Sequence, residues 1–310
     1  MNPTQKPPAI FLMGPTASGK TALAMTLYHQ LPVELISVDS ALVYRGMNIG
    51  TAKPSPAELA TTPHRLIDIR AIPDTYSAAD FCRDALAAMA EITARGNIPL
   101  LVGGTMLYYR TLELGLSPLP AADPDIRAEL QQRLDTEGLS VLQSELARVD
   151  PITAARIQDA QRVTRALEVW HITSQPLSTL QAQPGQAMPY RALKLICAPS
   201  ERSILHQRIH IRFANMLAAG FVDEVAGMIA QSELHAELPA MRAVGYRQVW
   251  AYLHNQYPYQ TMVERSEAAT RQLAKRQLTW LRKETEAQWL PDTAQLATAL
   301  PAINQFLTLS

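Results

Sequence analysis

A short stretch near the start of the chain has the residue types and spacing needed to hold phosphate groups. The pattern G-x-x-x-x-G-K-[ST] is matched by Gly14, Pro15, Thr16, Ala17, Ser18, Gly19, Lys20 and Thr21. In such a loop the backbone N–H groups point at the anion, Lys20 neutralises its charge and the Thr21 hydroxyl can bind Mg²⁺. The stretch predicts a phosphate site with Mg²⁺ as cofactor.

Two further positions could add chemistry beside this loop. Asp39 follows the apolar run Val33–Val38, which places it at the carboxyl end of an expected strand, where open α/β sheets bind ligands. It could act as a general base for an amine or hydroxyl, as a metal ligand, or as a helix cap. The stretch 103–105, Gly-Gly-Thr, ends another apolar run and indicates either a close backbone approach to a ligand or an ordinary turn.

The elements that position these residues alternate between strands and helices. Strand-length apolar runs at 9–13, 33–38 and 98–102 each end in turn residues, and Ser77 to Asp80 is a capping box for an Ala-rich helix that ends near Arg95. This rhythm predicts an α/β fold with a parallel sheet. Between about 117 and 189 only helices are expected, and a strand returns at 193–197.

The pattern therefore predicts a core made of residues 1–116 and 190–310, interrupted by a helical insertion at 117–189. The helices expected in the insertion are 125–137, 139–149 and 162–173. Those expected after it are 201–219, 222–231 and a long helix from about 262 to 286. Arg208 and Arg212 lie four residues apart on the first of these, hence on one face, which is either a solvated face or an anion site.

Composition limits the class of protein further. The chain has 310 residues with 28 Lys and Arg against 28 Asp and Glu, and 22 of the 28 cations are Arg, whose planar fork suits phosphate. The first 150 residues carry a net charge of −4 and the rest +4. Two cysteines 115 residues apart make no disulfide framework, and no apolar stretch is long enough for a signal peptide or membrane span. We expect a cytoplasmic protein with no membrane partner.

Several segments resemble the tRNA dimethylallyltransferase (isopentenyltransferase) family. They are GPTASGKT at 14–21, ISVDSALVYRGM at 36–47, IGTAKP at 49–54, PHRLID at 63–68, GGTMLY at 103–108, QRVTRALE at 161–168, RAVGYR at 242–247 and TRQLAKRQ at 270–277. The resemblance covers nearly the whole chain in the family's order. It implies a P-loop NTPase-like sheet core with a mostly helical, tRNA-facing insertion.

The resemblance also implies a reaction and its residues. A dimethylallyl group would pass from dimethylallyl diphosphate to the exocyclic amine of the adenosine just 3′ of the anticodon, releasing diphosphate. The loop residues 14–21 and Arg212 would bind the donor's diphosphate, and Asp39, Thr21, Lys20 and Arg212 would be catalytic. Asp39 would accept the proton of the adenine amine, and the enzyme is expected to act as a monomer.

The same resemblance names the residues expected to bind the tRNA anticodon stem-loop. They are Asp39, Ser40, Ala41, Leu42, Thr105, Arg127, Gln161, Arg162, Arg165, Arg242, Gly245, Tyr246, Arg247, Lys275, Arg276 and Arg282. The family often has Gln at the position of Ala41, where this chain has no polar side chain to offer. The last three belong to a basic run, which is either a solvated helix face or a surface for the RNA backbone.

Three other functions are compatible with parts of the sequence. A small-molecule or nucleoside kinase would use the same loop, with Asp39 as base or metal ligand and the insertion as a lid. A nucleotide-regulated RNA-binding protein would need neither Asp39 nor Arg212 for chemistry. An enzyme that prenylates free adenine nucleotides would not need the basic second half.

Overall fold

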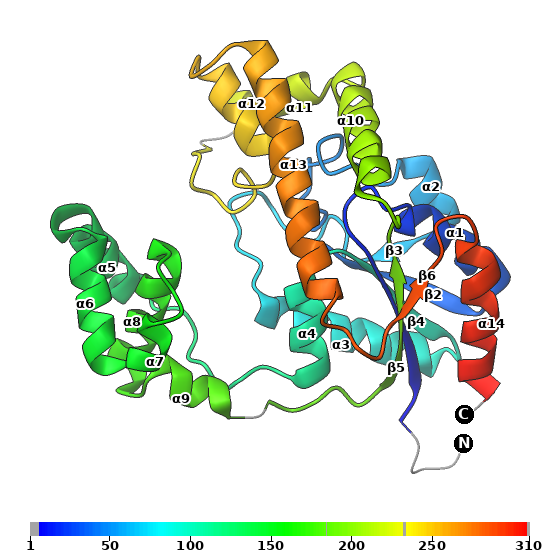
Figure 1. Cartoon of the computed structure of the whole chain (residues 1–310), viewed down its shortest axis with the longest axis horizontal. Coiled ribbons are helices and arrows are strands. Elements are labelled where there is room, and N and C mark those ends of the chain that lie inside the picture. Colours follow the sequence, from blue (N-terminus) through cyan, green and yellow to red (C-terminus); the bar gives the residue numbers. More distant parts are fainter. Residues whose placement is uncertain (1–5, 184, 232–233, 309–310) are drawn as a thin grey trace. The chain divides into compact units, whose positions relative to one another are not determined.

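The structure, a computed structural model, describes residues 6–183, 185–231 and 234–308 (Figure 1). The chain forms two compact units. The first, called the core unit, contains Met1–Arg110 and Pro189–Ser310, and the second, called the helical unit, contains Thr111–Met188.

A parallel sheet of six strands forms the centre of the core unit, in the order β3-β2-β4-β1-β5-β6. The strands are β1 (Pro8–Met13), β2 (Val33–Val38), β3 (His64–Arg65), β4 (Ile98–Gly103), β5 (Arg191–Cys197) and β6 (Gln288–Leu290). The central ones are almost continuously apolar because helices cover both faces of the sheet. The predicted α/β fold with a parallel sheet is confirmed.

Different helices cover the two faces of the sheet. On one face α1 (Lys20–Gln30) and α14 (Gln295–Thr308) pack together, and Leu27 and Ile303 join the strands in one buried cluster. On the other face α3 (Ala78–Ala94) packs on β2 and β4. The capping box predicted at its start is present, since Ser77 accepts from the Asp80 N–H and Asp80 accepts from the Ser77 N–H.

The remaining helices of the core unit lie mostly in its second segment. They are α2 (Pro56–Thr61), α4 (Met106–Leu114), which continues across the division, α10 (Arg202–Ala218), α11 (Phe221–Gln231), α12 (Tyr246–Leu253) and α13 (Tyr259–Leu281). None of the helices in the described segments is by itself long and apolar enough to cross a membrane. Only α10 with residues 221–230 reaches that length and composition, across a bend of 55°.

The helical unit has a core of its own. It contains α5 (Pro124–Glu137), α6 (Leu139–Val149), α7 (Pro151–Ala154), α8 (Ala160–Thr173) and α9 (Leu177–Ala182). Leu130, Leu142, Leu146, Val163 and Leu167 are all buried in one cluster. Asp123 and Asp159 cap the N-termini of α5 and α8, which explains where these helices begin.

The sequence pattern located most of the long elements, but it missed the 14-residue helix α14 and the short strands. Strands β1, β2, β4 and β5 lie where they were expected, whereas β3, with two residues, and β6, with three, were not predicted. The long helix predicted to end near 286 ends at Leu281, because the chain then turns into β6, which pairs with β5.

A close backbone approach fixes the tip of the sheet. A Cβ added at Gly103 would lie 2.0 Å from the Val38 carbonyl oxygen, so only glycine allows β4 to run this close to β2. In contrast, a Cβ added at Gly227 within α11 meets no atom within 4 Å. The surroundings of Gly103 therefore exclude a side chain, whereas those of Gly227 leave room for one.

We predict that Gly227→Ala stabilises the protein, by about 0.5–1 kcal/mol, because alanine loses less backbone entropy in a helix. Gly103→Ala should destabilise it, by about 1–3 kcal/mol, because the new methyl group forces β2 and β4 apart. Thermal unfolding of both variants beside the parent protein measures the two shifts. An unchanged midpoint for Gly103→Ala would show that the approach of the strands is not a constraint.

Candidate functional site

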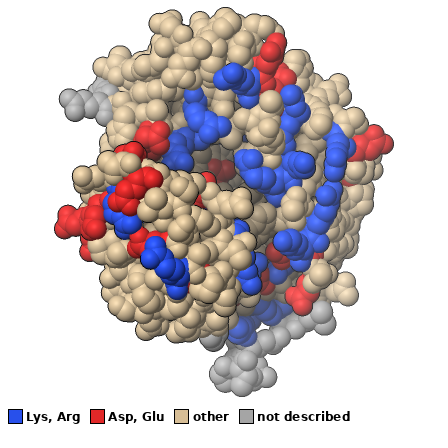
Figure 2. All heavy atoms as spheres, turned by 60° about the vertical axis from the view of Figure 1, so that its left-hand side comes forward, with Lys and Arg blue, Asp and Glu red and all other residues tan. Residues whose placement is uncertain are grey.

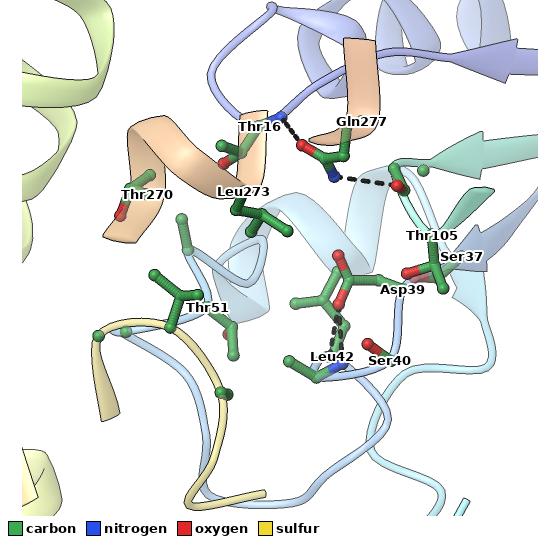
Figure 3. A pocket seen from close by; sticks show the side chains of 18 of the residues that line it. Thr16, Ser37, Asp39, Ser40, Leu42, Thr51, Thr105, Thr270, Leu273 and Gln277 are labelled. Atoms are coloured by element: carbon green, nitrogen blue, oxygen red, sulfur yellow. Dashed lines mark hydrogen bonds between the residues drawn. The ribbon is translucent and has the colours of Figure 1, made fainter. Parts of the chain in front are cut away.

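A cavity of about 500 Å³ lies at the carboxyl edge of the sheet in the core unit. Parallel strands present their carboxyl ends at one edge, so the segments after β1, β2 and β4 meet there. Thr16 from the first segment, Asp39 from the second and Thr105 from the third line this cavity (Figure 3). Lys20 and Thr21 from the first segment line it too. We call it the central cavity.

The phosphate-binding loop has the local geometry its sequence predicts. Gly19 has a φ of +91° and is the N-cap of α1, which begins at Lys20. Since glycine has no side chain, no side chain caps the first N–H groups of this helix. The N-terminal end of α1 thus offers uncapped donors and a positive partial charge to an anion.

The underside of the loop is packed against β5. The Cys197 Sγ–H donates to the Ser18 carbonyl oxygen at 3.2 Å, and a Cβ at Gly14 would lie 2.3 Å from the Cys197 carbonyl oxygen. The Ser18 side chain is buried, and its hydroxyl has no partner among the described residues. Burial raises the pKa of the Cys197 thiol, so it is a neutral packing group.

The Lys20 side chain is held by a backbone carbonyl group of the phosphate-binding loop. Its Nζ donates to the Pro15 carbonyl oxygen at 3.1 Å. Burial and then the nearby charge of Arg212 lower the pKa of Lys20 from 10.5 to about 8, and the charge of Asp39 opposes this shift more weakly. The surrounding groups therefore stabilise the positive charge of Lys20 only in part, and a bound anion would stabilise it further.

Arg212 and Arg208, both on α10, have different partners. Arg208 forms two hydrogen bonds with the Asp292 carboxylate, at 3.1 and 2.9 Å. Arg212 donates to the Thr51 carbonyl oxygen at 3.0 Å and has no carboxylate in hydrogen-bond contact among the described residues. Burial lowers its pKa, and the charge of Asp39 opposes the shift. Arg212 is thus the member of the pair available to an anion in the cavity.

A second cavity, of about 1190 Å³, lies on the other side of the phosphate-binding loop. It is called the outer cavity here. Lys20, Thr21 and Arg212 line both cavities, so the anion site lies where the two meet. Two ligands can therefore approach this site from different openings.

Asp39 uses one carboxylate oxygen for structure and leaves the other available. Its Oδ1 accepts hydrogen bonds from the N–H groups of Ala41, at 2.8 Å, and Leu42, at 3.2 Å. The second oxygen has no hydrogen-bond partner in the described part of the chain and points away from this turn in Figure 3. The carboxylate is thus held in place and can accept a proton.

The chain between β2 and α2 is held by a partly buried acid, Glu224. The Glu224 carboxylate accepts from the N–H groups of Asn48, Ile49 and Gly50, at 2.7 to 3.1 Å, and from the Tyr246 hydroxyl at 2.6 Å. Tyr246 is 0% exposed. The Tyr246 hydroxyl holds Glu224 and the residue also lines the central cavity, so its contact with tRNA stays a prediction.

The predicted basic run on α13 divides between two surfaces. Arg276 lines the central cavity, together with Arg242 and Gly245. Lys275 and Arg282 line a separate groove of about 310 Å³, called the basic groove, with Arg202, His206 and Arg271. Adjacent helix positions differ by about 100° in direction, which separates Lys275 from Arg276. Arg247 is exposed, and Figure 2 shows many Lys and Arg side chains on one face of the molecule.

The predicted residues of the helical unit lie around a buried acid and a hollow. Glu168 is 1% exposed and accepts from Arg127 at 2.9 Å and from Arg165 at 2.7 Å. Burial alone would raise the pKa of Glu168, but these hydrogen bonds and one from Asp123 lower it. Arg165 also lines a hollow in this unit with Gln161 and Arg162.

A family model described as IPP transferase matches residues 42–284. The chain belongs to the IPP transferase family. The match covers most of the chain, and the family predicted from the sequence is confirmed.

Three solved structures resemble this member of the IPP transferase family. The full-length tRNA isopentenylpyrophosphate transferase of Bacillus halodurans is 32% identical with a TM-score of 0.70, covering 98% of this chain and 96% of that chain. The tRNA delta(2)-isopentenylpyrophosphate transferase of Staphylococcus epidermidis is 31% identical with a TM-score of 0.69, covering 98% and 99%. A eukaryotic dimethylallyltransferase acting on tRNA is 25% identical with a TM-score of 0.81, covering 97% and 80%. The kinase alternative finds no support in these matches.

Some residues of this family member's site were missed by the sequence analysis. Gln277 joins the phosphate-binding loop to the end of β4, Glu224 holds the loop after β2, and His64 lines the central cavity. The His64 Nδ1 is 2.8 Å from the Thr62 carbonyl oxygen, its Nε2 is buried without a partner in the described segments, and burial lowers its pKa. His64 and Gln277 lie in segments that resemble the family, at 63–68 and 270–277, but no residue spacing assigned them a role.

The described residues contain no cluster of three or more His, Cys, Asp or Glu side chains that could hold a metal ion. Thr21 and Asp39 supply hard oxygen atoms in the central cavity, which is the donor type Mg²⁺ prefers. An ion at the predicted site would therefore draw most of its ligands from bound phosphate and water.

We predict that this protein takes up protons when inorganic diphosphate binds near pH 8. Free Lys20 is partly neutral there because its pKa is about 8, and a bound anion favours its charged form. The affinity should fall as the pH rises through this value. Calorimetry in buffers of different ionisation enthalpy measures the proton uptake.

Lys20→Gln is the matched control, because it keeps a polar side chain without a titrating group. It should bind diphosphate more weakly, with little proton uptake at pH 8. Equal uptake in the parent protein and the variant would mean that another group is the one that titrates.

Proposed function

We propose that this enzyme transfers a dimethylallyl group from dimethylallyl diphosphate to the exocyclic amine of the adenosine 3′-adjacent to the anticodon in tRNA, and releases diphosphate. The observation that carries the proposal is the arrangement in the central cavity. The available carboxylate oxygen of Asp39 and the anion site of Lys20 and Arg212 line one cavity. A base for the acceptor and a site for the leaving group therefore face each other.

The two cavities suit two substrates of different chemistry. The acceptor base enters the central cavity, which Asp39 and Thr105 line. The donor enters through the outer cavity, where Leu59, Ile211 and Leu296 offer apolar surface beside the phosphate-binding loop. The diphosphate lies at the residues that both cavities share, with the allylic carbon directed toward the base.

Charge develops on the diphosphate as the allylic C–O bond breaks. The uncapped N–H groups of α1 and the Lys20 and Arg212 side chains stabilise that charge where it appears. Because Lys20 and Arg212 are already partly buried and held by hydrogen bonds, little reorganisation accompanies the reaction. The electron pair of the broken C–O bond leaves with the diphosphate.

The exocyclic amine forms the new C–N bond and loses one proton. Its lone pair is delocalised into the ring, so it is a weak nucleophile, and alignment with the allylic carbon matters as much as basicity. Asp39 accepts a hydrogen bond from the amine and takes the proton as the bond forms. The backbone bonds to Ala41 and Leu42 hold this carboxylate in one orientation.

Mg²⁺ is proposed as the cofactor, with the Thr21 hydroxyl and diphosphate oxygens as its ligands. When bound, the ion neutralises part of the charge on the diphosphate. Thr21 is exposed at the first turn of α1 and lines both cavities, so its hydroxyl can serve this role without rearrangement of the fold.

The tRNA is proposed to bind as the anticodon stem-loop to a cytoplasmic monomer. A base stacked in the loop cannot bring its amine to the sheet edge, so the adenosine must turn out of the stack into the central cavity. Contacts between phosphates and cations such as Lys275 and Arg282 offset the unstacking cost of a few kcal/mol. Neither of these two side chains has an ion-pair partner in the described segments.

Incubation with labelled dimethylallyl diphosphate and tRNA, AMP or ATP as acceptors tests the proposal directly. Label should enter only tRNA, at the adenosine beside the anticodon. In the same assay Asp39→Asn should lower the single-turnover rate by roughly 10²–10⁴-fold, the usual effect of losing one acid/base group. Its affinity for inorganic diphosphate should be retained.

The asparagine variant separates two roles of Asp39. Its carboxamide oxygen can still accept from Ala41 and Leu42, but its nitrogen cannot take a proton. Asp39→Ala loses both roles and serves as the comparison. Turnover near that of the parent in Asp39→Asn, with a reduced rate only in Asp39→Ala, would show that the carboxylate merely holds the turn.

The double variant Lys275→Ala, Arg282→Ala should weaken tRNA binding and reduce its dependence on salt. For each phosphate that the variant no longer neutralises, the slope of log Kd against log salt should fall by about one unit or less. Filter binding across a salt series measures this slope. Arg83→Ala is the control, because Arg83 is exposed on α3 and pairs with Asp80 and Asp84. Equal slopes in all three proteins would make the groove an ordinary solvated surface.

A further inference from the structure

One carboxamide joins three segments of the core unit that are far apart in sequence. The Thr16 N–H donates to Gln277 Oε1 at 2.9 Å, and Gln277 Nε2 donates to the Gly104 carbonyl oxygen at 2.9 Å. Figure 3 shows the side chain reaching from α13 to both loops at the rim of the cavity. It thus connects the phosphate-binding loop, the end of β4 and α13.

The fit around this side chain is tight. A Cβ added at Gly104 would lie 2.4 Å from Gln277 Nε2 and 3.0 Å from the Gly14 carbonyl oxygen. Only a carboxamide accepts at one end and donates at the other in a plane of this size. Glutamate keeps the acceptor but loses the donor, and asparagine is one methylene too short to reach both loops.

These bonds set the distance between the two halves of the site. Thr16 belongs to the loop proposed to hold the donor, and Gly104 precedes Thr105, which lines the acceptor side. The helix α13 also carries Leu273 and Arg276, which line the same cavity. A rigid link among these segments fixes the separation of leaving group and acceptor before either substrate binds.

We propose that Gln277 is a positioning residue that aligns the donor loop with the acceptor side of the cavity. This inference rests on the proposed function for its kinetic readout but not for its structural one. Gln277 acts on the reaction through Thr16 and Gly104. Loss of the side chain should therefore affect the transfer rate more than the affinity for tRNA.

In single-turnover experiments Gln277→Ala should lower the transfer rate roughly 10- to 100-fold, which corresponds to the loss of two neutral hydrogen bonds and of alignment. The Kd for tRNA should stay within about twofold of the parent value, because no tRNA-binding charge is removed. Gln260→Ala is the matched control. Gln260 is exposed on the same helix and its side chain bonds to Glu264, one turn along.

Amide hydrogen exchange at Thr16, followed by NMR, is a readout that needs no activity. Exchange should accelerate in Gln277→Ala and stay slow in Gln277→Glu, since glutamate still accepts from the Thr16 N–H. The glutamate variant should nevertheless lose transfer rate, because its carboxylate cannot donate to Gly104. If Gln277 only stabilised the fold, both variants would melt at a lower temperature. The exchange of the Thr16 amide would then not distinguish Gln277→Ala from Gln277→Glu.

A double-mutant cycle tests whether the link to Gly104 is the operative one. Gly104→Ala should displace the Gln277 side chain and reproduce much of its kinetic defect. Combined with Gln277→Ala it should add little further defect, because both changes remove one shared interaction. Additive defects would overturn the proposed link.

The inference and the proposed function fail in different ways. If the parent protein transfers no dimethylallyl group, the proposed function is wrong, while the exchange of Thr16 still tests the link. A transfer rate and Thr16 exchange in Gln277→Ala that match those of Gln260→Ala would overturn the positioning role of Gln277.

Discussion

An imbalance of charge at the carboxyl edge of the sheet organises the rest of this structure. Lys20 and Arg212 are brought together beside the uncapped start of α1, and Arg212 helps to depress the pKa of Lys20. Asp39 is near enough to oppose both shifts, but one carboxylate cannot neutralise two cations. The fold keeps these charges in place so that a diphosphate, when it binds, meets groups already desolvated and directed.

The packing around this charge explains why the loops have little freedom. The phosphate-binding loop rests on Cys197 below and is held by Gln277 above, and the chain after β2 is held by Glu224. Each of these contacts ends on a backbone group, so it fixes the path of the chain and leaves the cavity-lining side chains available. Such an arrangement separates the residues that shape the site from those that react in it.

Much of this fold could be predicted because its signals are local. The loop at 14–21, the capping box at Ser77 and the apolar runs of the long strands each depend on residues within one short window. The link made by Gln277 joins positions 261 residues apart, and no spacing rule could reveal it. For the same reason the hydrogen bond between Tyr246 and Glu224 could not be predicted, because it depends on how α11 meets α12.

The division of cations on α13 extends this argument from fold to function. Arg276 belongs to the cavity where a base would react, whereas Lys275, its neighbour in sequence, belongs to the basic groove on another face. If tRNA binds as proposed, this helix would present one cation to the reacting base and the next to the RNA backbone, and would so connect tRNA binding with alignment at the site. Because Gln277 ties this helix to the phosphate-binding loop, the proposed tRNA contacts along α13 would act on a segment already fixed to the proposed donor site. Binding energy from the RNA can therefore be used to orient the adenine rather than to assemble the site.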